Sequence, residues 1–211
     1  MSELNVGKVY IIHYKKAERR REHMLCLLKN YNITNYQFRD FYQKEELTPE
    51  LREKYFMFKQ NTYCGIESYD RAYITITIEH IETFRDIVEN GVDDKWYLIF
   101  EDDAQPCGDF VNELNRHLEH VPEDADYLDI SNFFQINSPN MWERKDSTRT
   151  TISYLIKKET CKKLLTTIIP FEWAIDHELN KQFKIHDMKV YWSSKSLVFV
   201  DNHTFGSTLP T

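Results

Sequence analysis

Short apolar runs and longer periodic segments follow one another along the chain. The runs are bounded by polar residues, which is typical of β-strands. They lie at 8–14, 36–41, 96–100, 127–131, 151–156, 189–192 and 197–200.

The periodic segments carry an apolar residue at every third or fourth position, the spacing of one face of a helix. They lie at 16–30, 74–88, 110–120, 159–168 and 173–183. The segment 74–78 also alternates like a strand, but its apolar stripe continues through Ile81, Phe84 and Ile87 and stops at Gly91. A helix that ends at a glycine signal is therefore the preferred interpretation. We expect loops at 42–70 and 137–149.

The alternation of strands and helices predicts the fold. Strand–helix–strand units place parallel strands in one sheet and lay helices on both of its faces. We therefore expect an α/β protein with a mostly parallel sheet flanked by helices, in a single domain over residues 1–211. Ligands of such sheets bind beyond the carboxyl ends of the strands, so residues that directly follow a strand are candidate site residues.

Three consecutive carboxylates, Glu101, Asp102 and Asp103, follow the apolar run 96–100. An unpaired carboxylate costs several kcal/mol to bury, so we expect these acids outside the core with a cation beside them. A divalent Mn²⁺ or Mg²⁺ ion meets this requirement and leaves positions for substrate phosphates. The alternative is an acidic turn in solvent, which is common in a chain with 34 Asp and Glu residues.

Asp176 is a second acidic candidate, because it lies in an otherwise apolar segment after Pro170. Beside a cleft it could accept a proton from an attacking hydroxyl. From local sequence alone, an aspartate that complements the helix dipole is the favoured explanation.

Arg20 and Arg21 follow the first strand and could meet phosphates, although most charges there are expected on a solvated helix face. His80, on the apolar helix, is by default a hydrogen-bonded core or rim histidine.

Composition limits the classes of function. The chain has 41% hydrophobic residues and a net charge of −7, which is typical of a globular protein whose main partner is not a nucleic acid. Its four cysteines are far apart and form no CxxC pair, which argues against a zinc knuckle or disulfide framework and favours a reduced compartment. No signal-peptide or transmembrane pattern occurs, so we expect a cytoplasmic protein, with a peripheral membrane contact left open.

Six segments also occur in an order known from one family of enzymes. They are 9–14 with the following arginines, 79–91, 98–103, 151–165, 175–177 and 197–207. Together they resemble glycosyltransferase family 25, which contains bacterial lipooligosaccharide transferases and collagen hydroxylysine galactosyltransferases. Leu98 to Asp103 is similar to the metal-binding Glu-Asp-Asp motif of that family. The chain departs from the family at 72–76, where Gly-Glu-Ile-Gly-Cys is usual, and at His13-Tyr14, where Asn-Leu is usual.

The resemblance implies a GT-A-like fold and an inverting, metal-dependent transfer of a hexose. The donor would be a UDP-sugar and the acceptor a hydroxyl of a glycan or a protein. Residues from about 1 to 103 would form the half that binds the nucleotide sugar, and residues from about 104 to 211 the half that binds the acceptor.

The resemblance also assigns roles to residues. The metal ligands that it implies for Mn²⁺ or Mg²⁺ are Glu101, Asp102 and Asp103. The donor contacts that it implies are Arg20, Arg21, His80 and Asp102. Asp176 would be the catalytic base, and Asp201 or His203 would complete the metal shell or cover the site.

Two other classes of function stay open, as does the oligomeric state. The acidic cluster could serve a metal-dependent phosphodiesterase, which would need a second set of carboxylates or histidines and is not favoured by the net negative charge. The chain could also be a degenerate transferase that binds sugar nucleotides, or acts as a scaffold, without catalysis. The departure at 72–76 keeps that alternative open.

Overall fold

A computed structural model of the chain describes residues 2–57, 71–131, 136 and 138–200. Its strands are β1 (Val9–Ile12), β2 (Tyr36–Arg39), β3 (Trp96–Glu101), β4 (Ala104–Pro106), β5 (Tyr127–Asp129), β6 (Trp142–Lys145), β7 (Ser153–Lys157), β8 (Val190–Ser193) and β9 (Val198–Val200). Its helices are α1 (Glu18–Asn30), α2 (Pro49–Tyr55), α3 (Arg71–Asn90), α4 (Phe110–Leu118), α5 (Lys158–Leu165) and α6 (Ile175–Ile185), with a 3-10 turn η1 (Lys44–Glu46).

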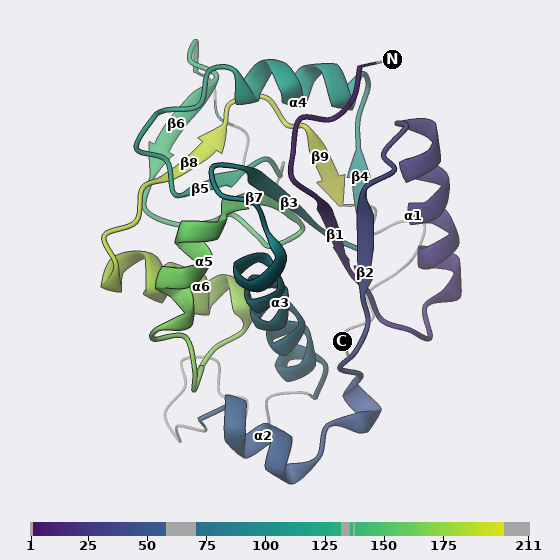
Figure 1. Cartoon of the computed structure of the whole chain (residues 1–211), viewed down its shortest axis with the longest axis vertical. Helices are drawn as coiled ribbons and strands as arrows, with labels where there is room; N and C mark the ends of the chain where they lie inside the picture. The colour runs from purple at the N-terminus through teal and green to yellow at the C-terminus, as the bar shows by residue number, and fades with distance from the viewer. Residues whose placement is uncertain (1, 58–70, 132–135, 137, 201–211) are drawn as a thin grey trace.

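Seven strands form one sheet in the order β2-β1-β3-β7-β5-β8-β6 (Figure 1). β1 is parallel to β2 and β3, and β5 is parallel to β8. β7 is antiparallel to both of its neighbours, β3 and β5, and β6 is antiparallel to β8. All strands except β6 and β7 therefore point the same way, which confirms the expected mostly parallel α/β sheet. β4 and β9 form a separate two-stranded sheet.

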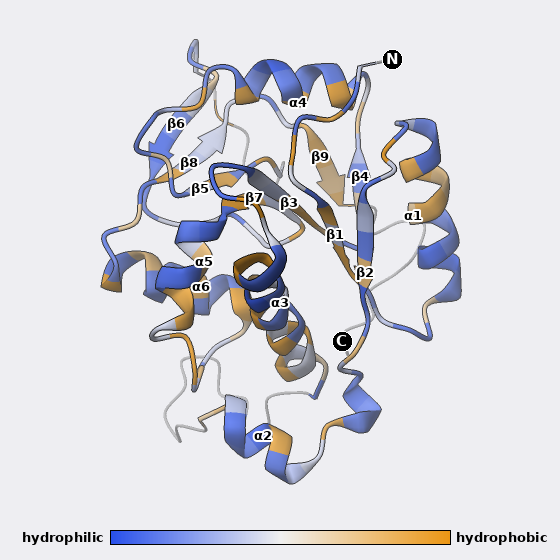
Figure 2. Cartoon of the chain, in the orientation of Figure 1, coloured by the Kyte–Doolittle hydropathy of each residue, from blue (hydrophilic) through white to orange (hydrophobic). Residues whose placement is uncertain are grey.

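Both faces of the large sheet are buried. In β1, Tyr10 and Ile12 belong to one apolar core, whereas Val9 and Ile11 belong to the other. Helices α3, α5 and α6 contribute to the first core, and α1 and α4 to the second. In Figure 2, β1 is coloured mainly as hydrophobic, whereas the sides of α4 and α5 that face the viewer are coloured mainly as hydrophilic. The prediction of helices on both faces is confirmed.

The segment with competing patterns is helical, as the longer stripe predicted. Ile74, Ile78 and Ile81 of α3 are buried in the core. The intervening threonines do not break the helix, because Thr75 and Thr77 donate their hydroxyl hydrogens to carbonyl oxygens one turn back, at 3.0 and 2.8 Å. The hydroxyls are thus satisfied inside the helix.

The expectation of loops at 42–70 and 137–149 is wrong where α2 and β6 form. Helix α2 starts at Pro49, and Thr48 caps it by accepting a hydrogen bond from the backbone N–H of Leu51 at 3.2 Å. This Thr-Pro start is a recognised helix signal. Strand β6 alternates weakly and takes its register from β8.

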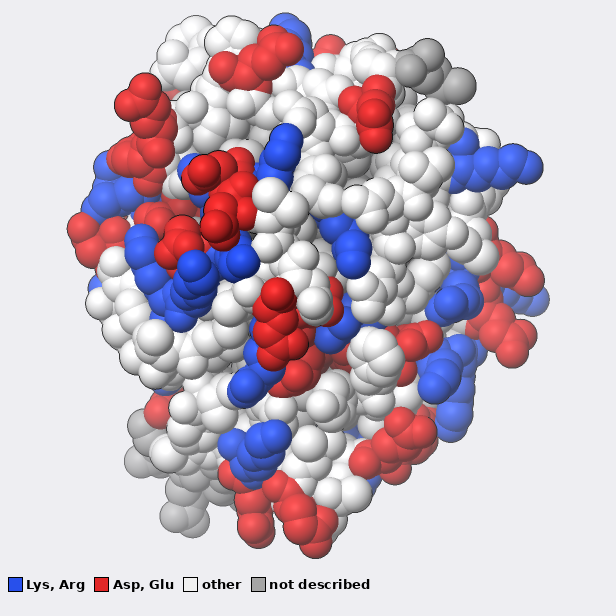
Figure 3. All heavy atoms as spheres, viewed as in Figure 1, with Lys and Arg blue, Asp and Glu red and all other residues white. Residues whose placement is uncertain are grey.

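The surface carries charges of both signs. Acidic and basic side chains are interspersed over the face shown in Figure 3. No helix in the described ranges is long and apolar enough to cross a membrane.

Candidate functional site

The carboxyl ends of β2, β1 and β3 lie side by side. The register pairs Ile12 of β1 with Arg39 of β2 and with Glu101 of β3. The residues that follow β1 and β3 therefore meet at one edge of the sheet. Ligands of such sheets bind at this edge.

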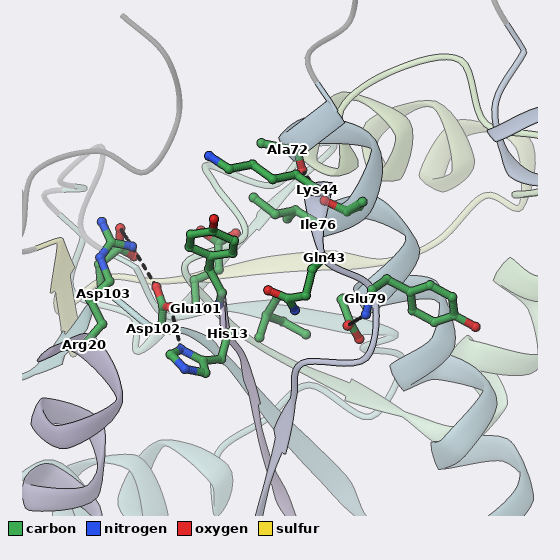
Figure 4. Close-up of a pocket in the computed structure, with 14 residues that line it drawn as sticks. His13, Arg20, Gln43, Lys44, Ala72, Ile76, Glu79, Glu101, Asp102 and Asp103 are labelled. Atoms are coloured by element: carbon green, nitrogen blue, oxygen red, sulfur yellow. Dashed lines mark hydrogen bonds and ion pairs between the residues drawn. The ribbon is translucent and has the colours of Figure 1, made fainter. Parts of the chain in front are cut away.

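A pocket opens here and encloses about 670 Å³, including its open mouth. The lining residues come from the ends of β1 and β2, one side of α3, Arg20 of α1 and the acidic cluster. They are Ile12, His13, Tyr14, Arg20, Tyr42, Gln43, Lys44, Ala72, Thr75, Ile76, Glu79, Glu101, Asp102 and Asp103. Arg20, Asp102 and Asp103 lie at one end and Glu79 at the other (Figure 4).

Asp102 is buried, and both of its carboxylate oxygens have partners. Oδ1 accepts a hydrogen bond from Arg20 Nη1 at 2.7 Å. Oδ2 lies 2.8 Å from His13 Nδ1 and accepts a hydrogen bond from the backbone N–H of Tyr14 at 3.1 Å. Asp102 is buried in the pocket wall and belongs to neither apolar core, and Arg20 supplies the positive charge expected beside the acids.

Asp103 has a different environment. Its Oδ2 lies 3.2 Å from Arg20 Nη1, whereas its Oδ1 is buried with no hydrogen-bond partner among the residues described. Burial and the charge of Glu101 raise the pKa of Asp103 to about 6, and Arg20 opposes the increase. A buried oxygen without a partner is costly unless a ligand or ion completes it. Asp103 is therefore the acid best suited to receive a cation.

Glu101 connects the cluster to the core. Its Oε1 accepts a hydrogen bond from Thr151 Oγ1 at 2.6 Å and lies 3.6 Å from His80 Nε2. His80 is fully buried, and its Nδ1 lies 2.7 Å from the hydroxyl oxygen of Tyr154. His80 thus lies behind the pocket and reaches it only through Glu101.

The acidic cluster suits a cation that is coordinated partly by one or two of its carboxylates and partly by the phosphates of a bound ligand. Within the described ranges, no group of three or more His, Cys, Asp or Glu residues is arranged to hold a metal ion by itself. Mg²⁺ and similar ions are often held by one or two carboxylates, with water and substrate phosphates in the remaining positions. Asp103 and Glu101 can supply such carboxylates. Asp201 and His203, which were expected to complete the shell, lie outside the described residues.

Besides His80, two further predicted site residues do not line the pocket. Arg21 pairs with Asp40 at 3.2 Å, and its guanidinium lies 4.1 Å from the centre of the Phe38 ring. Asp176 is in the first turn of α6 and accepts a hydrogen bond from the backbone N–H of His177 at 2.8 Å. Neither Arg21 nor Asp176 lines the pocket, and their roles remain predictions.

Sequence reasoning missed Glu79 and His13 as pocket residues. Glu79 is only 2% exposed, and its Oε1 accepts a hydrogen bond from the backbone N–H of Tyr42. Burial raises the pKa of Glu79 to about 7. A charged residue within the buried stripe of α3 was the available signal. His13 directly follows β1, so the rule that selected 101–103 would also have selected it.

The comparisons with known proteins identify a family and a fold. The family model described as glycosyltransferase family 25 (LPS biosynthesis protein) matches residues 6–179. A search of the curated proteins gives no match.

Three solved structures are similar to this chain. A glycosyltransferase involved in the glycosylation of the major capsid of PBCV-1 is 8% identical, with 93% of each chain covered and a TM-score of 0.51. Drosophila beta-1,4-galactosyltransferase 7, in a mutant complex with manganese, UDP-Gal and xylobiose, is 11% identical over 98% of this chain and 77% of that one, with a TM-score of 0.42. Mouse xyloside xylosyltransferase 1 is 11% identical over 99% and 90%, with a TM-score of 0.45. Only the first TM-score is high enough to bear on the fold, and it confirms the expected GT-A-like architecture.

Proposed function

Because the chain belongs to glycosyltransferase family 25, we propose that it transfers a hexose from a UDP-sugar to a hydroxyl of a glycan or protein, with inversion and with a divalent cation. Membership of the family makes it a glycosyltransferase. The donor, the cation and the stereochemistry are what the proposal adds. The single observation that carries it is the unpartnered, buried Oδ1 of Asp103 in a pocket at the carboxyl edge of the sheet.

The pocket suits the diphosphate of a sugar nucleotide. Arg20 and Lys44 line the pocket and can attract the negatively charged diphosphate. The acids that line it can attract the cation. All of its lining residues lie between 12 and 103. This supports the assignment of the first half of the chain to the donor and leaves the second half for the acceptor.

In the proposed reaction, the acceptor oxygen forms a bond to the anomeric carbon as the bond from that carbon to the diphosphate breaks. Asp103 and Glu101 would hold the cation, which when bound neutralises the charge that develops on the leaving diphosphate. Arg20 is held in place by Asp102 at 2.7 Å and faces the same end of the pocket. Its fixed charge requires no rearrangement during the reaction.

A base must take the proton from the acceptor hydroxyl, and Asp176 is the candidate in this proposal. Asp176 lies in the first turn of α6, where a carboxylate complements the positive end of the helix dipole. Asp176→Asn should then lower kcat at least a hundredfold while nucleotide affinity stays unchanged. An unchanged kcat would assign the base elsewhere.

Calorimetry with UDP tests the proposal. The wild-type protein should bind UDP more tightly with Mn²⁺ than without it, and Asp103→Asn should remove this difference while the thermal melt stays cooperative. Asp40→Asn is the control, because Asp40 pairs with Arg21 outside the pocket. Mn²⁺-dependent binding that persists in Asp103→Asn would reject the assignment.

Turnover separates an active enzyme from the binding-only alternative. An active transferase should release UDP from a UDP-sugar in the presence of Mn²⁺, with water as a slow acceptor. A degenerate module would bind the nucleotide and release nothing. The described residues hold no self-contained metal cluster of the kind that a two-metal phosphodiesterase requires.

A further inference from the structure

We propose that Glu79 selects the base of the donor nucleotide, because its unpartnered carboxylate oxygen accepts a hydrogen bond from a ring N–H of a base bound at that end of the pocket. This inference rests on the proposed function, since it assumes that the pocket takes a nucleotide.

The pocket has two chemically different ends. Arg20, Asp102 and Asp103 lie at one end, where a diphosphate and its cation find complementary charges (Figure 4). Glu79 lies at the other end (Figure 4), and α3 also contributes Ile76 and Thr75 to the lining of the pocket. The lining also includes the aromatic ring of Tyr42 and the apolar side chain of Ile76, against which a flat, uncharged ring can pack. The base of a nucleotide whose phosphates lie near Asp103 would therefore extend toward Glu79.

Glu79 retains an oxygen that can accept a hydrogen bond, whereas both polar atoms of the neighbouring Gln43 side chain already have partners. Its Oε1 accepts a hydrogen bond from the backbone N–H of Tyr42, and the backbone N–H of Phe41 also stabilises the carboxylate. Its Oε2 is buried and has no hydrogen-bond partner of good geometry in the described part of the chain. The adjacent Gln43 accepts from the backbone N–H of Lys15 at 2.8 Å and donates to the backbone carbonyl of Asp40 at 3.0 Å. Glu79 is therefore the acidic group at this end that still lacks a donor.

The geometry of one free oxygen points to one class of base. Uracil presents a single ring N–H between two carbonyl groups, which a single carboxylate oxygen can accept. Cytosine has an acceptor nitrogen at the same ring position and would place two acceptors against each other. With a cytidine nucleotide, Oε2 of Glu79 would stay buried and unpaired, which costs binding free energy. The contact should therefore favour uridine nucleotides over cytidine nucleotides.

The direction of the pH dependence follows from the same contact. Burial raises the pKa of Glu79 to about 7. The backbone N–H groups of Tyr42 and Phe41 and the charge of Arg39 lower this pKa, whereas the charge of Asp40 raises it. Tyr42 faces Glu79 from the segment after β2, and Glu82 lies one turn further along α3. A ligand N–H stabilises the ionised carboxylate, so affinity should rise as the pH increases through 7. A neutral Glu79 that donated its proton to a base carbonyl would give the opposite slope.

Calorimetry with three ligands tests the inference, with Mn²⁺ present throughout. At pH 8 the wild-type protein should bind UDP at least tenfold more tightly than N3-methyl-UDP or CDP, and the preference should shrink at pH 6. Glu79→Gln should lose most of the preference and all of its pH dependence. Glu82→Gln is the matched control on the same helix, because Glu82 pairs with Tyr55 and Arg85 and does not line the pocket.

The outcomes separate the inference from the function on which it rests. If the wild-type protein binds UDP and N3-methyl-UDP equally, or binds UDP more tightly at low pH, the role of Glu79 is rejected and the proposed function stands. If it binds no nucleotide with or without Mn²⁺, the proposed function fails. The wild-type ligand series decides the matter even if Glu79→Gln does not fold.

Discussion

The adjacent acids Asp102 and Asp103 have different hydrogen-bonding environments and therefore different roles in this site. Asp102 accepts hydrogen bonds from groups on the end of β1 and on α1, so it fixes the geometry of the edge. Asp103 shares Arg20 with it but keeps one buried oxygen unpartnered within the described chain. An arginine placed between them lowers the repulsion that two neighbouring carboxylates would otherwise feel. The first acid thereby holds the second in position to receive a ligand.

Asp102→Asn should destabilise the fold rather than only weaken ligand binding. The substitution removes the charge that compensates the buried Arg20 and places an amide where two acceptor oxygens had partners. We expect the free energy of unfolding to fall by about 1–3 kcal/mol in urea denaturation. Asp40→Asn, whose partner Arg21 is 41% exposed, should change it by about 0.5 kcal/mol or less. Equal effects would show that burial of the Asp102 pair contributes nothing.

The sequence predicted that the acids after β3 belong to a site, because an apolar strand cannot continue through three carboxylates. It could not predict which acid is buried. The partners that decide this, His13 and Arg20, lie 89 and 82 residues away along the chain. Glu79 was missed for a related reason, since its burial depends on the segment after β2 that covers it.

Glu79 should also make stability depend on pH. The pKa of Glu79 is about 7 in the fold, above its ordinary value of 4.5. The folded chain therefore binds this proton more tightly than the unfolded chain, and the stability that it contributes at low pH is lost as the pH rises from 4.5 to 7. Relative to Glu79→Gln, the wild-type protein should lose up to about 3 kcal/mol between pH 4.5 and pH 8. Parallel denaturation curves at the two pH values check this, and a constant difference would contradict it.

At the scale of elements, Tyr97 of β3 links the start of β1 to the end of α3. A Cβ atom on Gly7 would lie 2.7 Å from the Tyr97 ring. One on Gly91 would clash with the backbone carbonyl oxygen of Ile87 and would lie 2.7 Å from the Tyr97 hydroxyl oxygen. That hydroxyl donates to the carbonyl oxygen of Val92 at 3.1 Å. The helix ends where the sequence predicted, but the need for glycine comes from this close approach. Gly91 does not have a positive φ, unlike Gly108.

Gly91→Ala should therefore destabilise the protein through overpacking. The added methyl group would force the Tyr97 ring or the end of α3 to move, at a cost of about 1–3 kcal/mol. Asn90→Ala, at the exposed end of the same helix, serves as the control. A thermal melt of Gly91→Ala that matches the wild-type melt would mean that the Tyr97 ring and the last turn of α3, with the Ile87 carbonyl, adapt without strain.

The elements that the sequence predicted well are those with long, consistent periods. Helix α3 was assigned correctly because its apolar stripe outlasts the strand-like alternation at 74–78. Helix α2 and strand β6 were missed because they are short and depend on a cap or on a neighbouring strand. The antiparallel direction of β7 could not be inferred either, since the pattern of a buried strand does not reveal its direction.

At the scale of the whole molecule, the proposed donor and acceptor halves are not separate folding units. Strand β7 comes from the second half, yet it forms hydrogen bonds with β3 of the first half and with β5. Both apolar cores contain residues from both halves. A substrate bound between the halves would therefore rest on one continuous sheet.

This shared sheet predicts one cooperative unfolding transition for the full chain. Far-UV circular dichroism and tryptophan fluorescence should give coincident urea curves, because three of the four tryptophans lie in the second half and Trp96 lies in the first. A fragment of residues 1–103 should show no cooperative transition, since β3 would lose β7 and expose Ile99, which packs in the core on the α3 side of the sheet. If the fragment unfolded cooperatively by itself, the two halves would be independent domains, and the acceptor half could move relative to the donor half during catalysis.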